Sequence, residues 1–274
     1  MVERPPRSLG SVITEPSNAY QGVAAAWASG PAVMYDTLAS IAIAGVASEL
    51  RGRAVLDVGA GTGALCRALR VAGALPFAVD TSPDMLGQVG NAAVLAIAGD
   101  MCALPFPDSS FDAAVSGFAI SHIDTPADAL AEMHRVVRPR GRVIATVFGE
   151  ADGRVSKDVI DDVAQAFGFQ PPDWYVQLKT RTEPQSNTPE LLRGCAATAG
   201  LDDIAVADVT VDSGLATPEA ITAYRTGLAH LAPFVRSLPA QRRAEFIETA
   251  VAAVRTRGQA VRPRVLVLSS RVPA

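Results

Sequence analysis

A glycine-rich turn after a short apolar run is the part of this sequence best suited to hold a small ligand. The apolar run ends in Asp57. In the turn that follows, glycine occupies every second position: Gly59, Gly61 and Gly63. Glycine lets the chain turn tightly and brings bare backbone close to a ligand. Asp80 and Asp100 follow later apolar runs and can accept hydrogen bonds from ribose hydroxyls or an amino group. The pattern predicts a site for a ribose-containing cofactor.

Histidine is the other residue type in this sequence that could take part in a reaction. His122 lies in the stretch GFAISH, just beyond an apolar run. Its side chain titrates near neutral pH and can take a proton from a nucleophile, or it can hydrogen-bond a backbone carbonyl and shape the loop. His230, within LAHLAPF, either faces a substrate cavity or is a satisfied core residue. We expect His134 to be exposed on a helix.

The elements that must position these residues alternate between strand and helix. The pattern predicts strands over residues 54–58, 76–79, 93–98, 111–116 and 143–148, with helices over 62–72 and 126–137 and a helix start at Ser82. Such alternation is typical of a parallel sheet with helices on both faces. Because ligands bind at the carboxyl ends of parallel strands, the glycines, Asp80 and Asp100 are expected at one edge.

The segments before and after this part of the chain lack the regular alternation of strand and helix. Residues 1–17 are expected to be frayed, and residues 18–50 to be helical with a break near Gly30 and Pro31. Later segments are predicted as helices over 156–167 and 189–199, an irregular stretch over 171–184 that holds Trp174 and Tyr175, strands over 204–211 and 265–272, and a helical stretch over 217–257 interrupted at Pro233 and Pro239. We expect this last insertion over one end of the sheet.

The glycine turn by itself leaves two cofactor classes open. Gly59, Gly61 and Ala64 satisfy the GxGxxA form of nicotinamide and flavin enzymes. A pyrophosphate would lie against the helix N-terminus, however, and the carboxylate of Asp57 just upstream suits a less anionic ligand. Asp80 fits both classes.

The whole series of motifs is more specific. VLDVGAGTG, FAVD, GDM, LPFPDSSFDAAVS and RVVRPRGRVIA together resemble class I S-adenosylmethionine-dependent methyltransferases, most closely the methyltransferase type 11 branch, which includes ubiquinone-type and natural-product enzymes. The match covers residues 55–148. Pro139-Arg140-Gly141 stands where the family usually has Pro-Gly-Gly. The resemblance implies an α/β, Rossmann-like sheet of seven strands, five parallel followed by a C-terminal pair whose last strand is antiparallel, with a helical cap.

The resemblance also implies the cofactor, S-adenosyl-L-methionine, with S-adenosyl-L-homocysteine as product. It assigns the glycine turn to the methionine part, Asp80 to the ribose, and Asp100 with the Met101 backbone to the adenine. The full implied cofactor set is Tyr20, Asp57, Gly59, Gly61, Gly63, Asp80, Thr81, Met85, Asp100, Met101 and Phe118, with His122 near the transferred methyl as the catalytic candidate.

Several of these residues have structural alternatives. Asp57 can cap backbone N–H groups, and Asp80 can form an Asx turn before Ser82. Met85 can be core, and Tyr20 can pack inward with Trp27 from one helix face.

Composition narrows the function classes. The net charge of −4 and the lack of a basic stripe argue against nucleic acid; Arg138, Arg140 and Arg142 are expected on the two sides of a tight turn. Three widely spaced cysteines predict neither zinc nor disulfides, and the acidic pair Asp161-Asp162 is expected on a solvated helix face, so no metal site is predicted. No signal peptide or membrane span is evident, which predicts a soluble cytoplasmic protein without a membrane partner.

The sequence therefore predicts one domain with three parts: an N-terminal helical cap over 1–50, a cofactor core over 51–150, and a remainder over 151–274 that completes the sheet and caps the substrate. The predicted function is methyl transfer to oxygen or carbon of an apolar or aromatic small molecule, as in secondary metabolism, because the cap segments are rich in apolar residues. The alternatives are a cofactor-bound protein that promotes another reaction such as a cyclisation or stabilises a partner, a nicotinamide oxidoreductase, and an interaction module. The acceptor and the oligomeric state stay undetermined.

Overall fold

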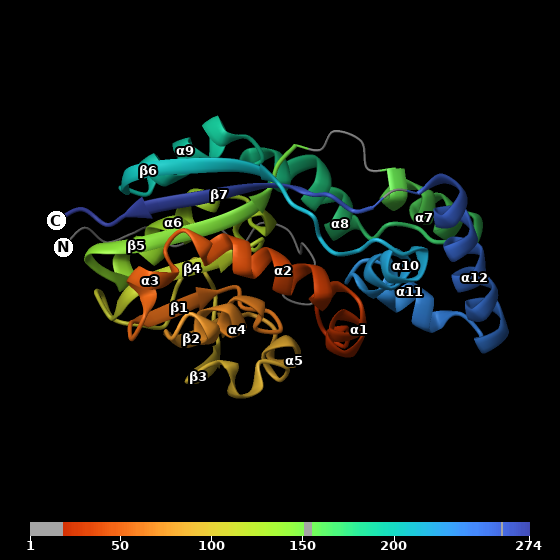
Figure 1. Ribbon diagram of the computed structural model, residues 1–274, viewed down its shortest axis with the longest axis horizontal. Helices are drawn as coiled ribbons and strands as arrows, with labels where there is room; N and C mark the ends of the chain where they lie inside the picture. The colour runs from red at the N-terminus through yellow and green to blue at the C-terminus, as the bar shows by residue number, and fades with distance from the viewer. Residues whose placement is uncertain (1–18, 151–154, 259) are drawn as a thin grey trace, which may run out of the picture.

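The predicted apolar runs pair into one seven-stranded sheet in the computed structural model, which describes residues 19–150, 155–258 and 260–274 (Figure 1). The strands are β1 Ala54–Val58, β2 Leu75–Asp80, β3 Leu95–Ala98, β4 Phe111–Gly117, β5 Val137–Phe148, β6 Asp202–Thr210 and β7 Arg264–Arg271. Their order is β3-β2-β1-β4-β5-β7-β6. β7 is antiparallel to β5 and β6, and the pairings among β1 to β5 are parallel. This confirms the predicted fold class.

The strand order reverses between β1 and β4, which are adjacent strands of the sheet. In an open parallel sheet, the loops that follow the two strands at such a switch point run in opposite directions. They leave a crevice at the carboxyl ends of these strands. The glycine turn follows β1 and the stretch containing His122 follows β4. Sheet topology therefore brings these two segments to the same crevice.

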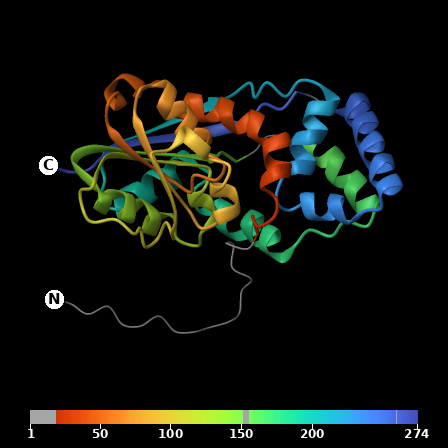
Figure 2. The ribbon, with the colours of Figure 1, turned by 90° about the horizontal axis from the view of Figure 1, so that it is seen from below.

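Helices cover both faces of the sheet (Figure 2). They are α1 Ala24–Ser29, α2 Pro31–Ala44, α3 Ala47–Leu50, α4 Ala64–Val71, α5 Pro83–Leu86, α6 Pro126–Val136, α7 Val155–Ala166, α8 Asp173–Gln177, α9 Pro189–Thr198, α10 Pro218–Gly227, α11 Ala232–Ser237 and α12 Ala240–Arg257. Successive side chains of β1 point to opposite faces of the sheet. Leu56 packs in the core that contains Leu130 of α6, and Val55 packs in the core that contains Leu69 of α4. Fully buried parallel strands need this cover on both sides.

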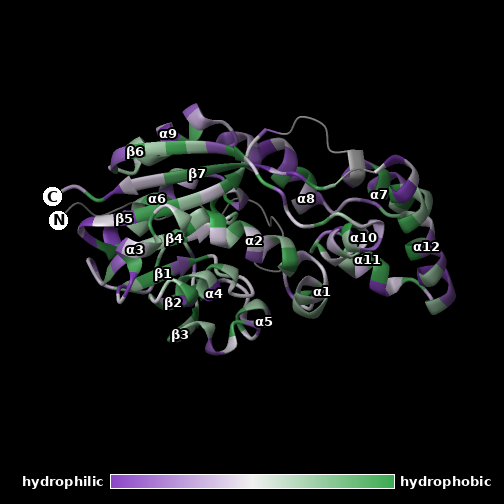
Figure 3. Ribbon diagram, in the orientation of Figure 1, coloured by the Kyte–Doolittle hydropathy of each residue, from purple (hydrophilic) through white to green (hydrophobic). Residues whose placement is uncertain are grey.

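A separate helical lobe lies beyond one end of the sheet, made by α7, α10, α11 and α12 (Figures 1 and 2). It has its own apolar core, which includes Ile160, Ile221 and Phe246. Helices α7 and α12 carry both hydrophilic and hydrophobic residues, as helices with one buried face do (Figure 3). α2 joins the two parts, because Leu38 belongs to the lobe core and Ile43 to a sheet core. The insertion therefore lies over one end of the sheet, as predicted.

Helix starts follow the predicted capping residues. The hydroxyls of Ser82, Thr188 and Thr217 each accept a hydrogen bond from the backbone N–H three residues later, and each is followed by proline at the first helical position. The break at Gly30 is also confirmed. A Cβ on Gly30 would lie 2.2 Å from the Ala223 carbonyl oxygen, so glycine there permits close approach of α10.

Three local predictions were wrong. Residues 171–184 are not irregular: α8 continues into a π-helical turn over Leu178–Thr182 and a 3-10 turn over Glu183–Gln185. Pro172 precedes the first helical residue and Pro184 lies in the first turn of the 3-10 segment, where a missing N–H is tolerated. β5 starts at Val137, and the expected tight turn is instead a strand irregularity with Arg140 at φ 64°. Pro233 lies within the first turn of α11 and not at the break before it.

The prediction of a frayed segment over 1–17 lies outside the described residues. Within the described ranges, no helix has both the length and the apolar character that crossing a bilayer requires.

Candidate active site

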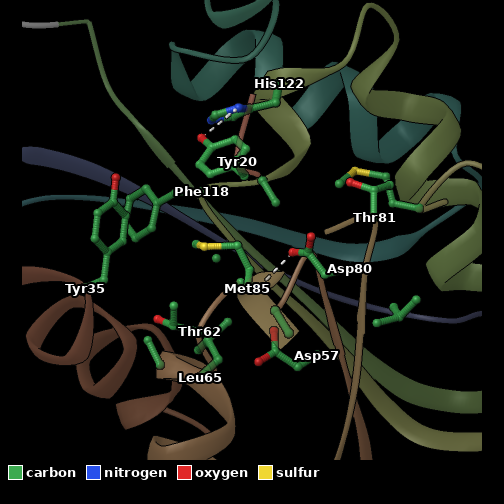
Figure 4. A pocket seen from close by; sticks show the side chains of 18 of the residues that line it. Tyr20, Tyr35, Asp57, Thr62, Leu65, Asp80, Thr81, Met85, Phe118 and His122 are labelled. Atoms are coloured by element: carbon green, nitrogen blue, oxygen red, sulfur yellow. Dashed lines mark hydrogen bonds between the residues drawn. The ribbon is translucent and has the colours of Figure 1, made fainter. Parts of the chain in front are cut away.

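A cavity of about 480 Å³ opens at the carboxyl ends of β1, β2 and β4. We call it the first cavity (Figure 4). It brings together all the predicted site residues except Gly63: Tyr20, Asp57, Gly59, Gly61, Asp80, Thr81, Met85, Asp100, Met101, Phe118 and His122. Gly63 instead precedes α4 with φ 83°, where a Cβ would lie 3.2 Å from the Val89 side chain. It serves helix packing.

The glycine turn needs glycine for two physical reasons. Gly59 has φ 72°, and a Cβ built on it would lie 2.3 Å from the Cβ of Ala119 in the loop after β4. Gly61 has φ 53°, and its N–H donates to Asp80 Oδ2 at 2.8 Å. Left-handed backbone disfavours any side chain, and the collision at Gly59 excludes even a methyl group. The turn is therefore fixed by the loop opposite and by the carboxylate of β2.

Asp80 is the organising carboxylate of the first cavity. Its Oδ1 accepts from the Ser82 N–H at 2.9 Å, which is the Asx turn considered as an alternative, while Oδ2 accepts from Gly61. Burial raises its pKa, against the opposing effect of these backbone N–H groups. Each carboxylate oxygen has two lone pairs, so both oxygens keep acceptor capacity toward a ligand's hydroxyls.

Asp57 lies deeper, at the end of β1, and is buried. Its Oδ2 accepts from both the N–H and the thiol of Cys66 at 3.1 Å, which is the capping alternative. Burial raises its pKa to about 7, and the hydrogen bonds from Cys66 oppose that rise. A positive charge in the cavity would favour the ionised form of this carboxyl.

The remaining polar groups test whether S-adenosylmethionine fits. Asp100 is exposed at the mouth and accepts from the Cys102 N–H at 2.8 Å. Thr146 Oγ1 of β5 is buried, lines the cavity and has no hydrogen-bond partner among the described residues. A buried hydroxyl without a partner costs free energy that a ligand can recover. Carboxylates for ribose and amino groups, bare backbone and an unsatisfied hydroxyl together fit this cofactor.

Five side chains separate the first cavity from a second one, and we call them the aromatic wall. They are Tyr20, Trp27, Tyr35, Phe118 and His122, and each lines both cavities. Ring centroids along the wall lie 5.8 Å apart between Tyr20 and Trp27 and 4.9 Å apart between Trp27 and Tyr35. The Tyr20 hydroxyl lies 3.4 Å from Nδ1 of His122, as the dashed line in Figure 4 marks. The wall is thus contributed by the N-terminal segment and by the loop after β4.

Phe118 holds its place in the wall with φ 58°, a conformation that residues other than glycine rarely adopt. Its N–H donates to the Thr146 carbonyl at 2.8 Å, and its ring stacks on Phe148 at 4.4 Å. Unusual backbone of this kind is retained where the surroundings fix it, often at ligand sites.

His122 is half-buried and lies between the two cavities. Burial lowers its pKa to about 4, more than the nearby Glu183 carboxylate raises it. The imidazole is therefore neutral at pH 7, and one ring nitrogen is available as a hydrogen-bond acceptor.

The second cavity, of about 430 Å³, lies between the aromatic wall and the helical lobe. Trp174 and Tyr175 line it together with His230. His230 is buried, and its ring stacks on Tyr175 with centroids 3.8 Å apart and planes 7° apart.

Two expectations outside the first cavity were wrong. Asp161 does not lie on a solvated face: it forms a bidentate pair with buried Arg225 at 2.7 and 2.8 Å, whereas Asp162 is exposed. His134 is half-buried, with Nδ1 2.8 Å from the Ala199 carbonyl oxygen. The sequence also gave no reason to single out Thr146 or Arg225, since neither belongs to a spaced motif. In the part of the chain that the structure describes, no group of histidine, cysteine and acidic side chains could hold a metal ion.

Comparison with known proteins identifies the core. A family model described as "Methyltransferase domain" matches residues 56–145. Residues 56–145 are a methyltransferase domain. Demethylmenaquinone methyltransferase of Renibacterium salmoninarum is 42% identical over 99 residues, which is 35% of this chain and 42% of that protein. The chain thus matches less than half the length of this curated relative. The resemblance to class I S-adenosylmethionine-dependent methyltransferases is confirmed.

Solved structures carry the same fold across most of the chain. A Haemonchus contortus phosphoethanolamine N-methyltransferase 2, in complex with phosphomonomethylethanolamine and S-adenosylhomocysteine, superposes with a TM-score of 0.52 at 19% identity over 82% of this chain and 49% of that one. The 4+2 cyclase SpnF gives a TM-score of 0.54 at 20% identity over 87% of this chain and 82% of that one. At these identities the likeness shows the fold of this chain.

Proposed function

We propose that this chain transfers the methyl group of S-adenosylmethionine to a small molecule held in the second cavity. The observation that carries the proposal is the shared aromatic wall, because a cofactor in the first cavity and an acceptor in the second would meet there. Bound S-adenosylmethionine supplies a methyl group that its sulfonium already activates. The chain then needs to align the two partners, and orientation alone is worth about 7–11 kcal/mol in favourable systems.

The cofactor-holding roles follow the geometry of the first cavity. Asp80 would accept from the ribose hydroxyls, since both its oxygens face the turn and keep acceptor capacity. Asp100 and the Met101 backbone would meet the adenine at the exposed mouth, and Asp57 and the bare backbone at Gly61 would meet the methionine part. Thr81, Met85, Phe118 and Tyr20 complete the lining.

His122 and the aromatic wall would act at the point of transfer. The neutral imidazole can accept a hydrogen bond from an acceptor hydroxyl and hold it in line. Its low pKa makes it a weak base, so its larger effect is positioning, with proton removal needed only where the acceptor atom carries a proton. The rings exclude water from the reacting atoms.

The division of the chain belongs to the same proposal. Residues 51–150 would hold the cofactor, residues 1–50 would close over it through Tyr20 and Trp27, and residues 151–274 would complete the sheet and shape the acceptor cavity. An apolar or aromatic acceptor of the kind found in secondary metabolism, methylated on oxygen or carbon, agrees with the aromatic lining.

The first test is calorimetric titration with S-adenosylhomocysteine, with NADH in a parallel cell. Saturable binding of S-adenosylhomocysteine alone supports the proposal, and binding of NADH alone contradicts it. Aromatic acceptors would then be screened for methylated product by mass spectrometry. Cofactor binding without any methylated product would favour the alternative of a cofactor-bound protein that promotes another reaction.

Two variants test the residue roles. Asp80→Ala should weaken S-adenosylhomocysteine binding at least about tenfold, because it removes an acceptor for charge-assisted hydrogen bonds. Asp108→Ala, with a side chain 76% exposed, is the control and should bind normally. His122→Ala should leave the affinity nearly intact and reduce turnover; unchanged turnover would exclude His122 from the reaction.

A further inference from the structure

The charged side chains that line the second cavity are paired within the protein. The ion pairs join Lys179 to Glu183, Arg225 to Asp161, Arg262 to Asp212 and Arg264 to Asp208. Lys157, which also lines the cavity, has an interaction partner of its own. A charged group on a ligand would have to displace one of these partners. Recognition of the acceptor therefore depends on the neutral polar groups of the cavity.

His230 is a neutral polar group of this cavity that has an unpaired nitrogen. The residue is only 6% exposed, it lines the second cavity, and its Nε2 has no hydrogen-bond partner among the described residues. Burial lowers the pKa of the imidazole and keeps it uncharged. Buried polar atoms are paired in the great majority of cases, and each exception needs an explanation. A polar atom of the ligand supplies that explanation.

The surroundings of His230 fix the plane of its imidazole. Its sequence neighbours Ala229 and Leu231 are buried and apolar. Its ring stacks on Tyr175, with centroids 3.8 Å apart and planes 7° apart, and Arg225 Nη2 donates to the Tyr175 hydroxyl at 3.1 Å. The imidazole is therefore held in place before a ligand arrives, which reduces the entropy cost of binding.

A run of ring contacts leads from the aromatic wall to His230. The ring centroid of Trp174 lies 6.4 Å from that of Tyr20 and 5.8 Å from that of Tyr175, which stacks on His230. His122 lines both cavities, whereas His230 lines the second cavity only. His230 would therefore contact a part of the acceptor other than the end that lies at the aromatic wall.

The chemistry of a neutral imidazole selects the group that pairs with it. One ring nitrogen carries a proton and donates, the other accepts, and the tautomer decides which of these Nε2 is. A carbonyl oxygen can only accept, so it suits one tautomer. A hydroxyl group both donates and accepts, so it pairs with Nε2 in either tautomer.

Resting on the proposed function, we propose that the acceptor carries a neutral hydroxyl group that hydrogen-bonds Nε2 of His230, while a different atom of the acceptor receives the methyl group at the aromatic wall. The hydroxyl at His230 is held away from the wall, so the product retains it. A site built to bind a hydroxyl discriminates against an analogue that lacks one, because its own polar group is then left unpaired.

The test uses the intrinsic fluorescence of the protein. Trp27 and Trp174 are the only tryptophans, and both line the second cavity, so their emission excited at about 295 nm reports its occupancy. The probes are pairs in which a methyl group replaces the hydroxyl: 2-phenylethanol with propylbenzene, 3-phenylpropan-1-ol with butylbenzene, and 4-phenylbutan-1-ol with pentylbenzene. Saturating S-adenosylhomocysteine keeps the first cavity occupied.

In the wild type, the alcohol of at least one pair should bind as tightly as its hydrocarbon or more tightly. A hydroxyl buried without a partner loses its hydrogen bonds to water, so an apolar cavity would favour the hydrocarbon. Tighter binding of the hydrocarbon in every pair, or no binding of any alcohol, would overturn the proposal.

Variants locate the preference. His230→Phe should weaken binding of the preferred alcohol about tenfold and change the affinity for its hydrocarbon less than about threefold. His230→Gln should retain most of the affinity for the alcohol, because its amide has both a donor and an acceptor. An alcohol affinity that His230→Phe leaves unchanged, or an equal loss for both probes, would overturn the assignment to His230.

His134→Phe is the matched control. This half-buried histidine lies on α6 and lines neither cavity, and its Nδ1 lies 2.8 Å from the Ala199 carbonyl oxygen. The variant should bind every probe as the wild type does. The same loss of alcohol affinity in His134→Phe would show that the effect is not local to the cavity and would overturn the assignment.

The outcome is separable from that of the proposed function. The wild-type comparison of the probes needs no variant and stands even where a substitution prevents folding. S-adenosylhomocysteine binding is read separately by calorimetry. Its loss would contradict the proposed function, whereas its presence without a preference for the alcohol would contradict only the present inference.

Discussion

The two cavities on either side of the aromatic wall are built by different means. The first is shaped mostly by backbone: a glycine turn, strand ends and loops, with Asp80 fixing the turn through hydrogen bonds from Gly61 and Ser82. The second is shaped by long side chains that stack and pair, with Tyr175, His230 and Arg225 at its centre. Tyr175 lies in α8, Arg225 in α10, and His230 in the turn between α10 and α11.

This difference has consequences for specificity. A backbone-lined site depends on main-chain geometry that most substitutions cannot alter, so it suits a constant ligand. A site lined by side chains changes with each substitution, so the same core can serve different acceptors. This contrast predicts that a substitution which impairs one cavity leaves the other intact. The substitutions below test this prediction, beginning with the one that should have the strongest effect.

Gly59→Ala should abolish measurable S-adenosylhomocysteine binding. The added methyl group would collide with Ala119 Cβ at 2.3 Å, on top of the strain of a left-handed φ. Gly214→Ala is the matched control, because Gly214 has φ 75° and no atom within 4 Å of the added Cβ. It should cost about 1–2 kcal/mol of stability and leave binding unchanged. Calorimetry and thermal unfolding measure both; normal binding by Gly59→Ala would show that the turn tolerates side chains.

Asp161→Asn should lower the free energy of unfolding by about 3–5 kcal/mol, because it leaves the charge of Arg225 buried without its carboxylate. The Arg225 side chain is only 4% exposed. Asp162→Asn, the exposed neighbour, should change stability by less than about 0.5 kcal/mol. Denaturant titration gives these values. Because Asp161 belongs to the second cavity's support, S-adenosylhomocysteine affinity should persist, and its loss would show that the cavities are not separable.

His122 should make stability fall with acid. Its folded pKa of about 4 lies below the unfolded value of about 6.5, so the unfolded chain binds the proton first. Stability is therefore complete above about pH 7 and is lost as the pH falls toward 4, with about 2 kcal/mol lost between pH 7.5 and pH 5. Denaturant titrations of wild type and His122→Asn should diverge by this amount, and the contribution of His230 cancels in the comparison. Parallel pH profiles would mean that His122 is solvated.

Tyr20→Phe should have the smallest effect. It removes the hydroxyl 3.4 Å from His122 Nδ1 and keeps the ring that packs on Trp27. A long hydrogen bond of this kind contributes about 0.5–1 kcal/mol, so S-adenosylhomocysteine affinity should change less than about fivefold. Calorimetry at pH 7.5 measures it. A loss beyond tenfold would show that the hydroxyl itself contacts the ligand and not only the wall.

The sheet and the first cavity could be predicted from local sequence patterns. Short apolar runs, capping residues such as Ser82 and Thr188, and a glycine turn act over a few residues, and parallel topology then brings the strand ends to one edge. The strand order alone is therefore enough to predict that Asp80 lies beside Gly61.

The second cavity, in contrast, depends on contacts between segments that are far apart in the sequence. Asp161 was expected in solvent because a helical acidic pair is usually exposed, and nothing nearby in sequence marks its partner, 64 residues away. The stacking of His230 on Tyr175 and the presence of Lys157 and Lys179 in one cavity likewise depend on how the helical lobe packs on the sheet. Such contacts are fixed by the burial of whole helix faces, which leaves no short-range pattern in the sequence.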